Sequence, residues 1–329
     1  MLWFAFGIAV VVLLVYSISL YTYFECFHSP ANRREDPYSK LIGEQYDEVN
    51  ERIINCTKRM DEAECEWVST VSHDGLKLYG RYYHTRDGAP VVILFHGYRS
   101  MTLRDSAGGY YLCQKMGFNV LAVDQRAHGR SQGTVISFGI KERWDCLSWT
   151  DYVLKRFGNN TLVVLSGLSM GASTVLMATA LDLPENVCAI MADCPYSAPA
   201  DIIRKVCRDR HMPDHLAYPF ILLGAKVFGK FDLTETTSVE AVRQAKVPVL
   251  LIHGEDDRFV PCQMSRNIYS ACASPATLQI IPDAGHGLCY IKSPQRYEEV
   301  ITKFLWSVCK LRLHMVGNEF IRKELQTDG

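Results

Sequence analysis

A glycine-flanked serine is the clearest chemical signal in this chain of 329 residues. The segment Gly167-Leu168-Ser169-Met170-Gly171 has the form G-x-S-x-G, follows the apolar run TLVVLS and opens the helix-like run ASTVLMATA. This setting predicts a sharp strand-to-helix turn with Ser169 at its tip, where the two glycines remove side chains that would collide. A serine in that position can attack an acyl carbonyl once a base takes its proton. The setting disfavours the alternative, an ordinary turn with an incidental serine.

His286 is the preferred base among the ten histidines. It lies in PDAGHGLCY, just after the last predicted strand, on a loop whose glycines let an imidazole reach the edge of a sheet. His253 ends an earlier apolar run, while His211 and His215 fall in a region expected to cap the site, where surface or gating roles are more usual. The chain order Ser, Asp, His, which one large group of serine hydrolases uses, favours His286.

A carboxylate is needed to orient the base and to stabilise its protonated form. The segment HGEDDRFVP follows a predicted strand and offers both Asp256 and Asp257. Asp257 is the preferred acid and Asp256 the second choice. Asp193, at the end of the preceding predicted strand, is a third possibility, although a carboxylate that caps the following turn is the more ordinary interpretation.

The negative oxygen of a tetrahedral intermediate needs two backbone N–H donors. The residue after the nucleophile, Met170, is expected to supply one of them. The other is expected from the loop after VVILF, where Gly97 lets the backbone approach the substrate and the Tyr98 amide is the natural donor. His96, in the same loop, is then structural rather than a base.

Apolar strands alternate with helix-length segments from Glu64 onward. The β-rich runs CEWVSTVS and LKLYGRYY, separated by His73-Asp74-Gly75, predict a hairpin. Later apolar runs are continuous, which suits strands buried on both faces of a parallel sheet. These runs are 91–95, 118–124, 161–166, 187–193, 247–253 and 276–282. The pattern predicts an α/β fold with a mostly parallel, doubly wound sheet and helices on both faces.

The predicted organisation places a polar linker with a short helix at 29–60, the α/β domain at 61–312 and a C-terminal tail at 313–329. Within the domain, the interval between the strands that end at 193 and begin at 247 is longer than one crossover needs. It holds the apolar run AYPFILLGAKVFG, so we expect a small helical cap over the sheet edge at about 197–246. Extra surface helices remote from the site are the alternative.

An uncharged segment near the N-terminus predicts a transmembrane helix within residues 1–28. The run Leu2–Phe24 has no charged residue, and as a helix it would extend about 34 Å, enough to cross a hydrocarbon core about 30 Å thick. The competing interpretation is a cleaved signal peptide, which the missing basic residues before the run and the missing cleavage site disfavour. Arg33, Arg34 and Lys40 follow the run and place the catalytic domain on the cytoplasmic side of a single-pass protein.

Composition and charge exclude some classes of protein. Apolar residues make up 48% of the chain and charged residues 22%, as in proteins with a substantial core. The formal net charge of −1 argues against nucleic-acid binding, which usually needs a basic excess. The 12 cysteines are scattered and form no Cys-x-x-Cys pair, which indicates buried thiols in a reducing compartment rather than disulfides or a metal site. No metal ion or organic cofactor is expected.

Five segments together resemble the α/β-hydrolase superfamily, and more closely its bacterial serine-aminopeptidase-like and acyl-esterase-like branch. They are LFHGYRS, VLAVDQRAHGRSQG, SGLSMGAST, VPVLLIHGEDDRFVP and DAGHG, in the order the family has them, and the resemblance covers about residues 64–310. It implies an α/β-hydrolase fold and favours Asp257 over Asp256 as the acid. Ala127 stands where the family more often has glycine, and Asp124, Arg126 and His128 of that segment are implied to be scaffold residues.

These observations predict a membrane-anchored serine hydrolase that cleaves an acyl bond through an acyl-enzyme, with a carboxylic ester as the preferred substrate. Its substrate is expected to be a small or lipid-like acyl compound. A serine peptidase or a thioesterase is the alternative; a peptidase would use an acidic cluster such as Asp201, Asp209 and Asp214 for the substrate's amino terminus. A catalytically silent, membrane-tethered interaction module is the alternative from another class. The sequence predicts no oligomeric state.

Overall fold

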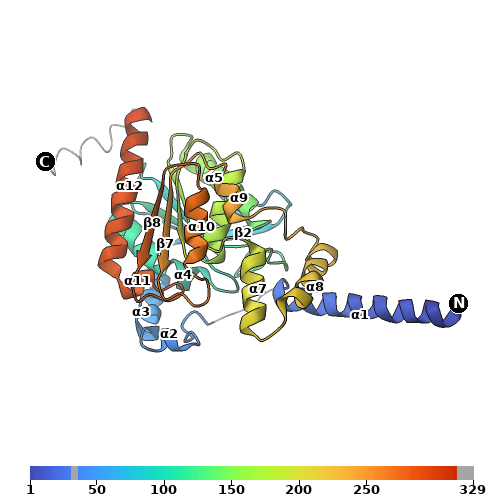
Figure 1. Ribbon diagram of the computed structural model, residues 1–329. Helices are drawn as coiled ribbons and strands as arrows, with labels where there is room; N and C mark the ends of the chain where they lie inside the picture. Colours follow the sequence, from blue (N-terminus) through green and yellow to red (C-terminus); the bar gives the residue numbers. More distant parts are fainter. Residues whose placement is uncertain (31–35, 317–329) are drawn as a thin grey trace.

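An eight-stranded sheet forms the centre of the computed structural model, which describes residues 1–30 and 36–316 (Figure 1). The strand order is β1-β2-β4-β3-β5-β6-β7-β8. β1 and β2 form an antiparallel hairpin at one edge, β2 pairs antiparallel with β4, and the strands from β3 to β8 run parallel. Their bounds are Glu66–Val71, Lys77–Tyr83, Val91–Phe95, Asn119–Asp124, Val163–Leu168, Val187–Asp193, Val249–Gly254 and Ala276–Ile281. The predicted hairpin and the mostly parallel α/β sheet are confirmed.

Two layers of helices cover the sheet because successive residues of a strand point to opposite faces. Val92 and Leu94 of β3 pack with α3, α4 and α12 on one face, while Val91 and Ile93 pack with α5, α6, α9 and α10 on the other. The first layer comprises α3 (Asn50–Glu62), α4 (Thr102–Lys115), α11 (Cys289–Lys292) and α12 (Pro294–Val316). The second comprises α5 (Glu142–Phe157), α6 (Met170–Met177) with a short 3₁₀ helix (Ala178–Ala180), α9 (Ser238–Val242) and α10 (Gln263–Ala271).

The strand order reverses beside β3, which leaves a crevice at the carboxyl edge of the sheet. β3 pairs with β4 on one side and with β5 on the other, so the loops that follow β3 and β5 diverge at the carboxyl edge of the sheet. Parallel α/β sheets bind their ligands at such points. The loop after β3 begins at His96 and the turn after β5 holds Ser169.

Two helices lie between α1 and the sheet, in the region 29–60 for which the sequence predicts a linker with a short helix. After the short α2 (Glu44–Asp47), α3 is a helix of 13 residues that packs against α4. Val49, Ile53, Thr57 and Met60 are buried on one side of it. This segment therefore belongs to the layer that covers the sheet, because its apolar residues recur at helical spacing.

Two helices lie between β6 and α9, where the sequence predicts a cap. They are α7 (Pro199–Asp209) and α8 (Asp214–Val227), and Figure 1 shows both beyond the sheet, next to α1. Ile202 of α7 and Tyr218 of α8 share an apolar cluster with Met170 at the start of α6. The limits of the cap and of the domain stay predictions. α12 extends to Val316, and the rest of the predicted tail lies outside the described residues.

The N-terminal α1 (Leu2–Cys26) is one continuous helix of 25 residues that projects from the domain (Figure 1). Within the described residues it alone is long and apolar enough to cross a membrane. Arg33 and Arg34, on which the predicted orientation rests, lie outside the described residues.

Candidate active site

Ser169 occupies a strained turn between β5 and α6. Its φ of 55° lies in the left-handed region, which residues other than glycine rarely adopt. A Cβ at Gly167 would lie 2.2 Å from the backbone of Gly171, and a Cβ at Gly171 would lie 2.1 Å from the carbonyl oxygen of Phe95. The amide of Ser169 donates to the carbonyl of Asp193 at 2.8 Å. Glycine at both positions therefore lets the turn pack against β3 and hold the serine at the sheet edge.

His286 connects Ser169 to Asp257. Its Nε2 lies 2.9 Å from the Ser169 Oγ, and its Nδ1 lies 2.7 Å from the Asp257 Oδ2. The imidazole is mostly buried, and the Phe259 ring packs edge-on against it with centroids 5.1 Å apart. The structure thus brings together the three residues that the sequence singles out, from three separate loops at the carboxyl edge of the sheet.

Asp257 is held as an ionised carboxylate. Its Oδ1 accepts hydrogen bonds from the amides of Phe259 and Val260, at 2.9 and 2.7 Å. Burial opposes ionisation, but the contacts from His253 and His286 outweigh it and hold the pKa of Asp257 well below its usual range. Asp256, the second choice from the sequence, is exposed and does not contact His286.

The other histidines near the site have structural partners. His253 is fully buried between the Ser265 hydroxyl at 2.6 Å and the Val260 carbonyl at 2.7 Å. His96 contacts the carbonyl of Gly97 through Nδ1, and its Nε2 accepts the amide of Gln125 at 3.1 Å. Because neither reaches Ser169, both hold loops rather than move protons at the nucleophile.

The segment after β4 forms the scaffold that the resemblance implies. Arg126 is buried and donates to the carboxylates of Asp145 and Asp74. Asp124 accepts from the Thr102 hydroxyl at 2.5 Å and from the Arg130 amide at 2.9 Å. These groups hold the loop next to the site and make no contact with Ser169 or His286.

The two candidate oxyanion residues flank Ser169. A Cβ at Gly97 would lie 3.4 Å from the Ser169 Cβ, so the loop that carries Tyr98 runs directly beside the nucleophile. The Gly97 amide donates to the Asp105 Oδ2 at 2.7 Å, which fixes this loop to α4. Met170 is the first residue of α6, where backbone N–H groups lack partners within the helix and favour negative charge.

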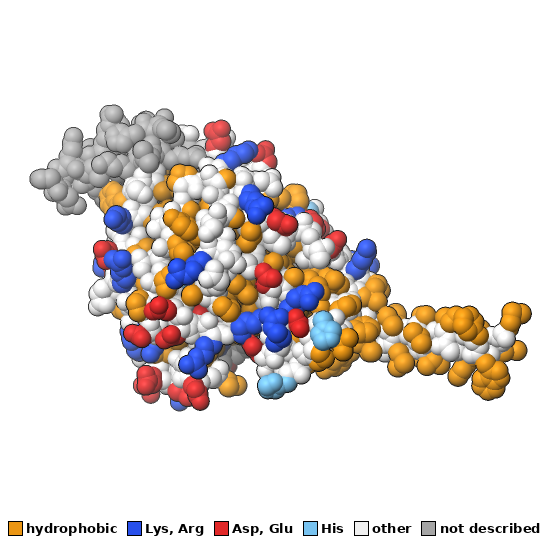
Figure 2. Space-filling view, in the orientation of Figure 1, with side chains coloured by type: hydrophobic (Ala, Val, Ile, Leu, Met, Phe, Trp, Pro, Cys, Tyr) orange, Lys and Arg blue, Asp and Glu red, His pale blue; other side chains and the backbone are white. Residues whose placement is uncertain are grey.

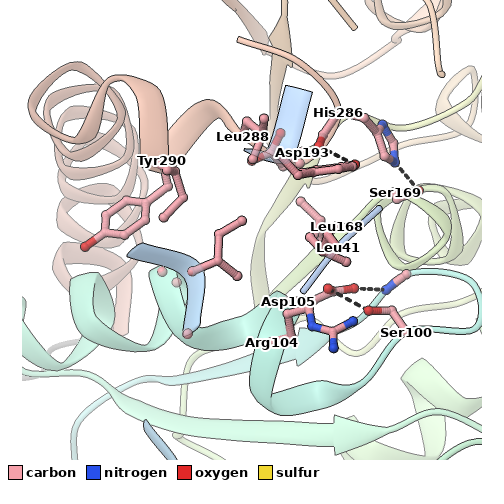
Figure 3. Close-up of a pocket in the computed structure, with 18 of the residues that line it drawn as sticks. Leu41, Ser100, Arg104, Asp105, Leu168, Ser169, Asp193, His286, Leu288 and Tyr290 are labelled. Carbon is pink, nitrogen blue, oxygen red and sulfur yellow. Dashed lines mark hydrogen bonds between the residues drawn. The ribbon is translucent and has the colours of Figure 1, made fainter. Parts of the chain in front are cut away.

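A pocket of about 290 Å³ opens beside these residues. Figure 3 shows Ser169 and His286 on one side of it and Tyr290 on the other. Ser100, Arg104 and Asp105 line its polar part. The apolar part is lined by Leu41, Ile53, Cys56, Leu168, Leu288, Tyr290 and Ile291. The pocket thus combines a polar region at the nucleophile with an apolar extension between α3, α4 and α11.

Two residues that sequence reasoning missed hold the loop of His286. The Gln45 Oε1 accepts the backbone amide of His286 at 3.1 Å, and the Tyr46 hydroxyl donates to the carbonyl of His286 at 3.2 Å. Gly285 is required beside them because a Cβ there would lie 2.1 Å from the Gln45 Oε1. The helical spacing of Val49, Ile53 and Met60 could have revealed that this segment packs on the domain, although not that it reaches His286.

Asp193 is a buried carboxyl that lines the same pocket. Its Oδ1 has no hydrogen-bond partner. Burial raises the pKa of Asp193 to about 6, against the opposing effects of the Tyr297 hydroxyl, His253, the Cys289 thiol and His286. It lies on the pocket side of the sheet, so it does not cap the following turn as the sequence suggests, and the acid that contacts His286 is Asp257.

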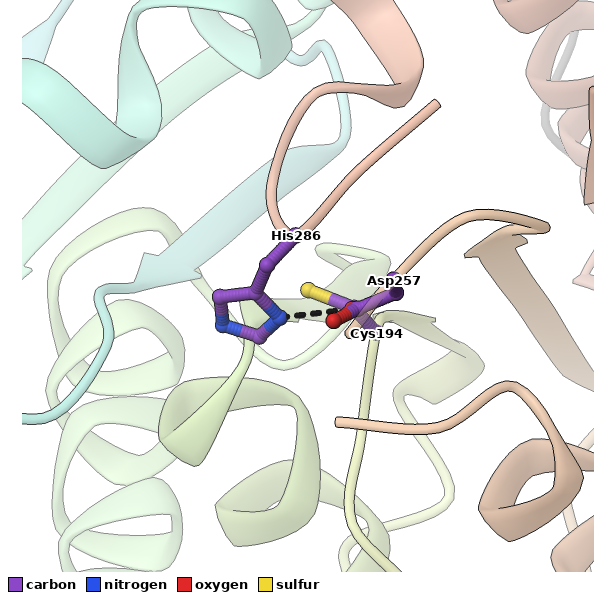
Figure 4. A group of neighbouring side chains, drawn as sticks. All are labelled: Cys194, Asp257 and His286. Atoms are coloured by element: carbon purple, nitrogen blue, oxygen red, sulfur yellow. Dashed lines mark hydrogen bonds and ion pairs between the residues drawn. The ribbon is translucent and has the colours of Figure 1, made fainter. Parts of the chain in front are cut away.

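Cys194, Asp257 and His286 place three possible metal ligands within 4.8 Å of one another (Figure 4). Burial raises the pKa of the Cys194 thiol well above its usual value, whereas metal binding requires the thiolate. Both nitrogens of His286 already contact Asp257 and Ser169. The arrangement therefore suits proton transfer to and from Ser169 better than metal binding.

The sequence matches one family model and several known proteins. The family model described as the alpha/beta hydrolase family matches residues 92–300. The uncharacterized protein YqkD of Bacillus subtilis is 25% identical, over 70% of this chain and 76% of its own. The lysophosphatidylserine lipase ABHD12 of Macaca fascicularis is 26% identical, over 60% of this chain and 50% of its own, so the match spans only half of that relative.

Solved structures share the fold at lower sequence identity. The esterase Pf2001 of Pyrococcus furiosus superposes with a TM-score of 0.60 at 22% identity, over 81% of this chain and 95% of its own. Est1E of Butyrivibrio proteoclasticus, solved with ferulic acid, gives a TM-score of 0.56 at 19% identity, over 74% of this chain and 100% of its own. At these identities the likeness concerns the fold.

Proposed function

Because the chain belongs to the alpha/beta hydrolase family, we propose that it is a membrane-anchored serine hydrolase that cleaves a carboxylic ester of a lipid-like acyl substrate. The observation that carries the proposal is the chain of contacts from Ser169 through His286 to Asp257, at 2.9 and 2.7 Å. A buried, ionised Asp257 fixes the imidazole, and the imidazole lies within hydrogen-bond reach of the serine hydroxyl.

The mechanism follows from these contacts. His286 Nε2 takes the proton of the Ser169 hydroxyl while the Oγ attacks the acyl carbonyl, and the carboxylate of Asp257 stabilises the imidazolium. The amides of Tyr98 and Met170 donate to the oxyanion. His286 then gives its proton to the leaving alcohol, which departs and leaves the acyl group on Ser169. Water, deprotonated by His286, attacks this ester and releases the acid and the free serine.

The pocket favours a substrate with one acyl chain. Its apolar extension begins at Leu168, next to the nucleophile, and continues between Leu288 and Tyr290. A volume of about 290 Å³ is near the lower end of the range for ligand pockets, which leaves room for one chain rather than two. The relative ABHD12, by its name, acts on a lysophospholipid, which has one acyl chain. We therefore place single-chain lipid esters first among candidate substrates.

Membrane anchoring is supported by the length and apolar composition of α1, and the loop that carries Tyr98 is fixed to the end of this helix. The Tyr98 hydroxyl donates to the carbonyl of Cys26 at 2.8 Å, and Arg99 donates to the carbonyl of His28 at 3.0 Å. The active site is thus fixed to the last turn of α1. If α1 crosses a membrane, the active site is held close to the membrane surface, where lipid esters are concentrated. Lys40, exposed after the span, agrees with a cytoplasmic domain.

A peptidase is the second candidate, and the cap gives it little support. The Asp214 carboxylate pairs with Arg208 at 2.8 Å, Asp209 pairs with Lys205, and the Asp201 Oδ2 accepts from the Ser197 hydroxyl at 2.5 Å. Because all three acids have partners of their own, they offer no open site for an amino terminus. A thioesterase would use the same chemistry as an esterase and differs only in the leaving group.

The proposal is tested by labelling the full chain in detergent with a fluorophosphonate. We expect rapid labelling of the wild type, none of Ser169→Ala, and unchanged labelling of the control Ser270→Ala, whose serine is exposed on α10. Hydrolysis is then compared among acyl esters, thioesters of the same acyl chain and aminoacyl anilides. Failure of the folded wild type to label would overturn the serine mechanism and favour the silent interaction module, and preference for anilides would favour the peptidase.

A further inference from the structure

The anchor helix α1 packs along the cap helix α8, although the two helices are far apart in the sequence. The Thr22 hydroxyl donates to the carbonyl of Phe220 at 3.1 Å. A Cβ at Gly224 would lie 2.6 Å from the carbonyl oxygen of Ser19, so glycine permits the close approach of the two helices. The rings of Tyr16 and Phe228 stack edge-on at 5.1 Å. One side of α1 from Tyr16 to Tyr23 therefore packs against α8, and the two helices run antiparallel.

The end of α1 is also fixed to the domain. Phe27 is fully buried, with its ring 5.2 Å from that of Phe231 and 5.8 Å from that of Phe138. His28 forms a β-bridge with Val135, and the amide of Ser29 donates to the carbonyl of Thr134 at 2.9 Å. The direction of α1 relative to the domain is therefore set by packing.

The length of α1 then determines how deep α8 must lie. The hydrocarbon core of a bilayer is about 30 Å thick. The part of α1 that projects beyond α8, Leu2 to Val15, is only about 21 Å long. A complete crossing therefore requires about 9 Å of the part that packs against α8, which carries the C-terminal half of α8 into the near leaflet.

The outer face of α8 has the composition that this position requires. Leu216, Pro219, Leu223 and Val227 recur every three or four residues and are exposed, Leu216 to 59%, Leu223 to 37% and Val227 to 48%. No Asp, Glu, Lys or Arg occurs between Asp214 and Lys226. The inner face, with Tyr218, Ile221 and Ala225, is buried against the domain. A surface helix in water would have a polar outer face.

Figure 2 shows hydrophobic side chains continuing from α1 onto the adjoining end of the domain, where α8 lies in Figure 1. We propose that α8 is a second membrane contact. Leu223 and Val227 of its outer face insert into the near leaflet of a lipid bilayer beside α1, and Leu216 and Pro219 lie closer to the headgroups. Lys226 and Lys230, both exposed at the deeper end, can extend their chains back toward the headgroups. The proposal rests on the membrane anchoring proposed above.

The test uses the full chain in phosphatidylcholine–phosphatidylglycerol vesicles, with a benzoylphenylalanine photo-crosslinker at one position at a time. Position 223 reports on α8, position 13 reports on the exposed part of α1, and position 269, an exposed tyrosine on α10, is the control. We expect lipid adducts at 13 and 223, seen as added mass on the peptide that carries the probe, and far fewer at 269. Binding of each variant to the vesicles is checked by flotation.

The outcomes separate the two proposals. Lipid adducts at 13 without adducts at 223 leave the anchor in place and overturn the α8 contact. An adduct between two copies of the chain at 223 would overturn it as well, since that face would then be a dimer interface. No adducts at either position overturn both proposals. Adducts at 223 alone support the α8 contact and overturn the crossing of α1.

Discussion

The side-chain hydroxyl of Tyr98 donates a hydrogen bond of 2.8 Å to the backbone carbonyl of Cys26. This bond joins the loop beside Ser169 to the last turn of α1. Tyr98→Phe removes the hydroxyl and keeps both the backbone amide and the packing of the ring on Phe138, with centroids 4.9 Å apart. We expect a loss of about 1 kcal/mol in the free energy of unfolding. Circular dichroism in micelles should show a melting temperature lower by about 2 °C.

The same variant should keep its reaction with fluorophosphonate, because the proposed donor to the oxyanion is the amide and not the hydroxyl. Loss of labelling in a folded Tyr98→Phe protein would mean that the hydroxyl itself takes part in the chemistry, and the assignment of the Tyr98 amide would have to be withdrawn.

Asp257 and Asp256 form a matched pair for testing the acid. The Asp257 carboxylate is buried 2.7 Å from His286, while the neighbouring Asp256 is exposed. Asp257→Asn should lower kcat by about 10⁴, because the amide cannot hold the tautomer that accepts the serine proton. Asp256→Asn should leave kcat unchanged. Steady-state hydrolysis of a short ester measures both, and similar losses in the two variants would refute the assignment.

The buried carboxyl of Asp193 should make stability depend on pH. Its pKa is about 6 in the folded protein, mainly because of burial, and about 3.9 in an unfolded chain. Between these two pH values the Asp193 carboxyl is protonated more often in the folded protein than in the unfolded chain. The contribution of this carboxyl to the free energy of unfolding therefore falls as pH rises from about 4 to 6. The full effect is on the order of 3 kcal/mol.

Asp193→Asn carries no charge at any pH and removes this dependence. The difference in free energy of unfolding between variant and wild type should therefore shift in favour of the variant as pH rises from 4 to 7. Burial also raises the pKa of Asp145 to about 6, but Asp145 is present in both proteins and cancels in the difference. Chemical denaturation at four pH values measures the difference, and a constant difference would show that Asp193 does not titrate in this range.

The sheet and the three residues at its edge could be predicted because their signals are local. Continuous apolar runs mark the buried strands, and the spacing of Gly167 and Gly171 around Ser169 marks the turn that a Cβ at either position would block. The chain order then selects His286. The strands and the turn need only a few neighbouring residues, and the choice of His286 needs only the order of the three residues along the chain.

The wall of the pocket could not be predicted in the same way. Gln45 and His286 are separated by 241 residues, and nothing in either segment indicates that they meet. The composition of residues 29–60 is polar overall and therefore predicts a linker. The charged residues on the exposed side of α3 outnumber the buried apolar residues Val49, Ile53 and Met60 in this average. The contact depends on where α3 docks on α4, which is a property of the whole fold.

The pocket position of Cys56 provides a test of the acyl-chain assignment. Cys56 lies on α3, is half-buried and lines the apolar part of the pocket. Cys56→Phe should fill this space, so kcat/KM should fall about tenfold or more for long acyl esters, the loss expected when about 1.4 kcal/mol of binding is removed. Acetyl esters, which need no extension, should be hydrolysed as before. An equal loss for all chain lengths would indicate general damage to the site.

Gln45 and Gly285 together offer a test of whether the segment after α1 positions the base. Gln45→Ala removes the acceptor of the His286 amide, and we expect kcat to fall about three- to tenfold, as for one lost hydrogen bond, with KM and the melting temperature nearly unchanged. Gly285→Ala should have a similar effect, because its Cβ would lie 2.1 Å from the Gln45 Oε1 and displace that side chain.

The double variant distinguishes positioning from general disturbance. The nearest atoms to a Cβ at position 285 all belong to Gln45, so Gly285→Ala should do little harm once Gln45 is alanine. The two losses in kcat should therefore not add, and the double variant should resemble Gln45→Ala alone. Additive losses would mean that Gly285→Ala acts on the His286 loop directly, and Gln45 would then have no demonstrated part in holding the base.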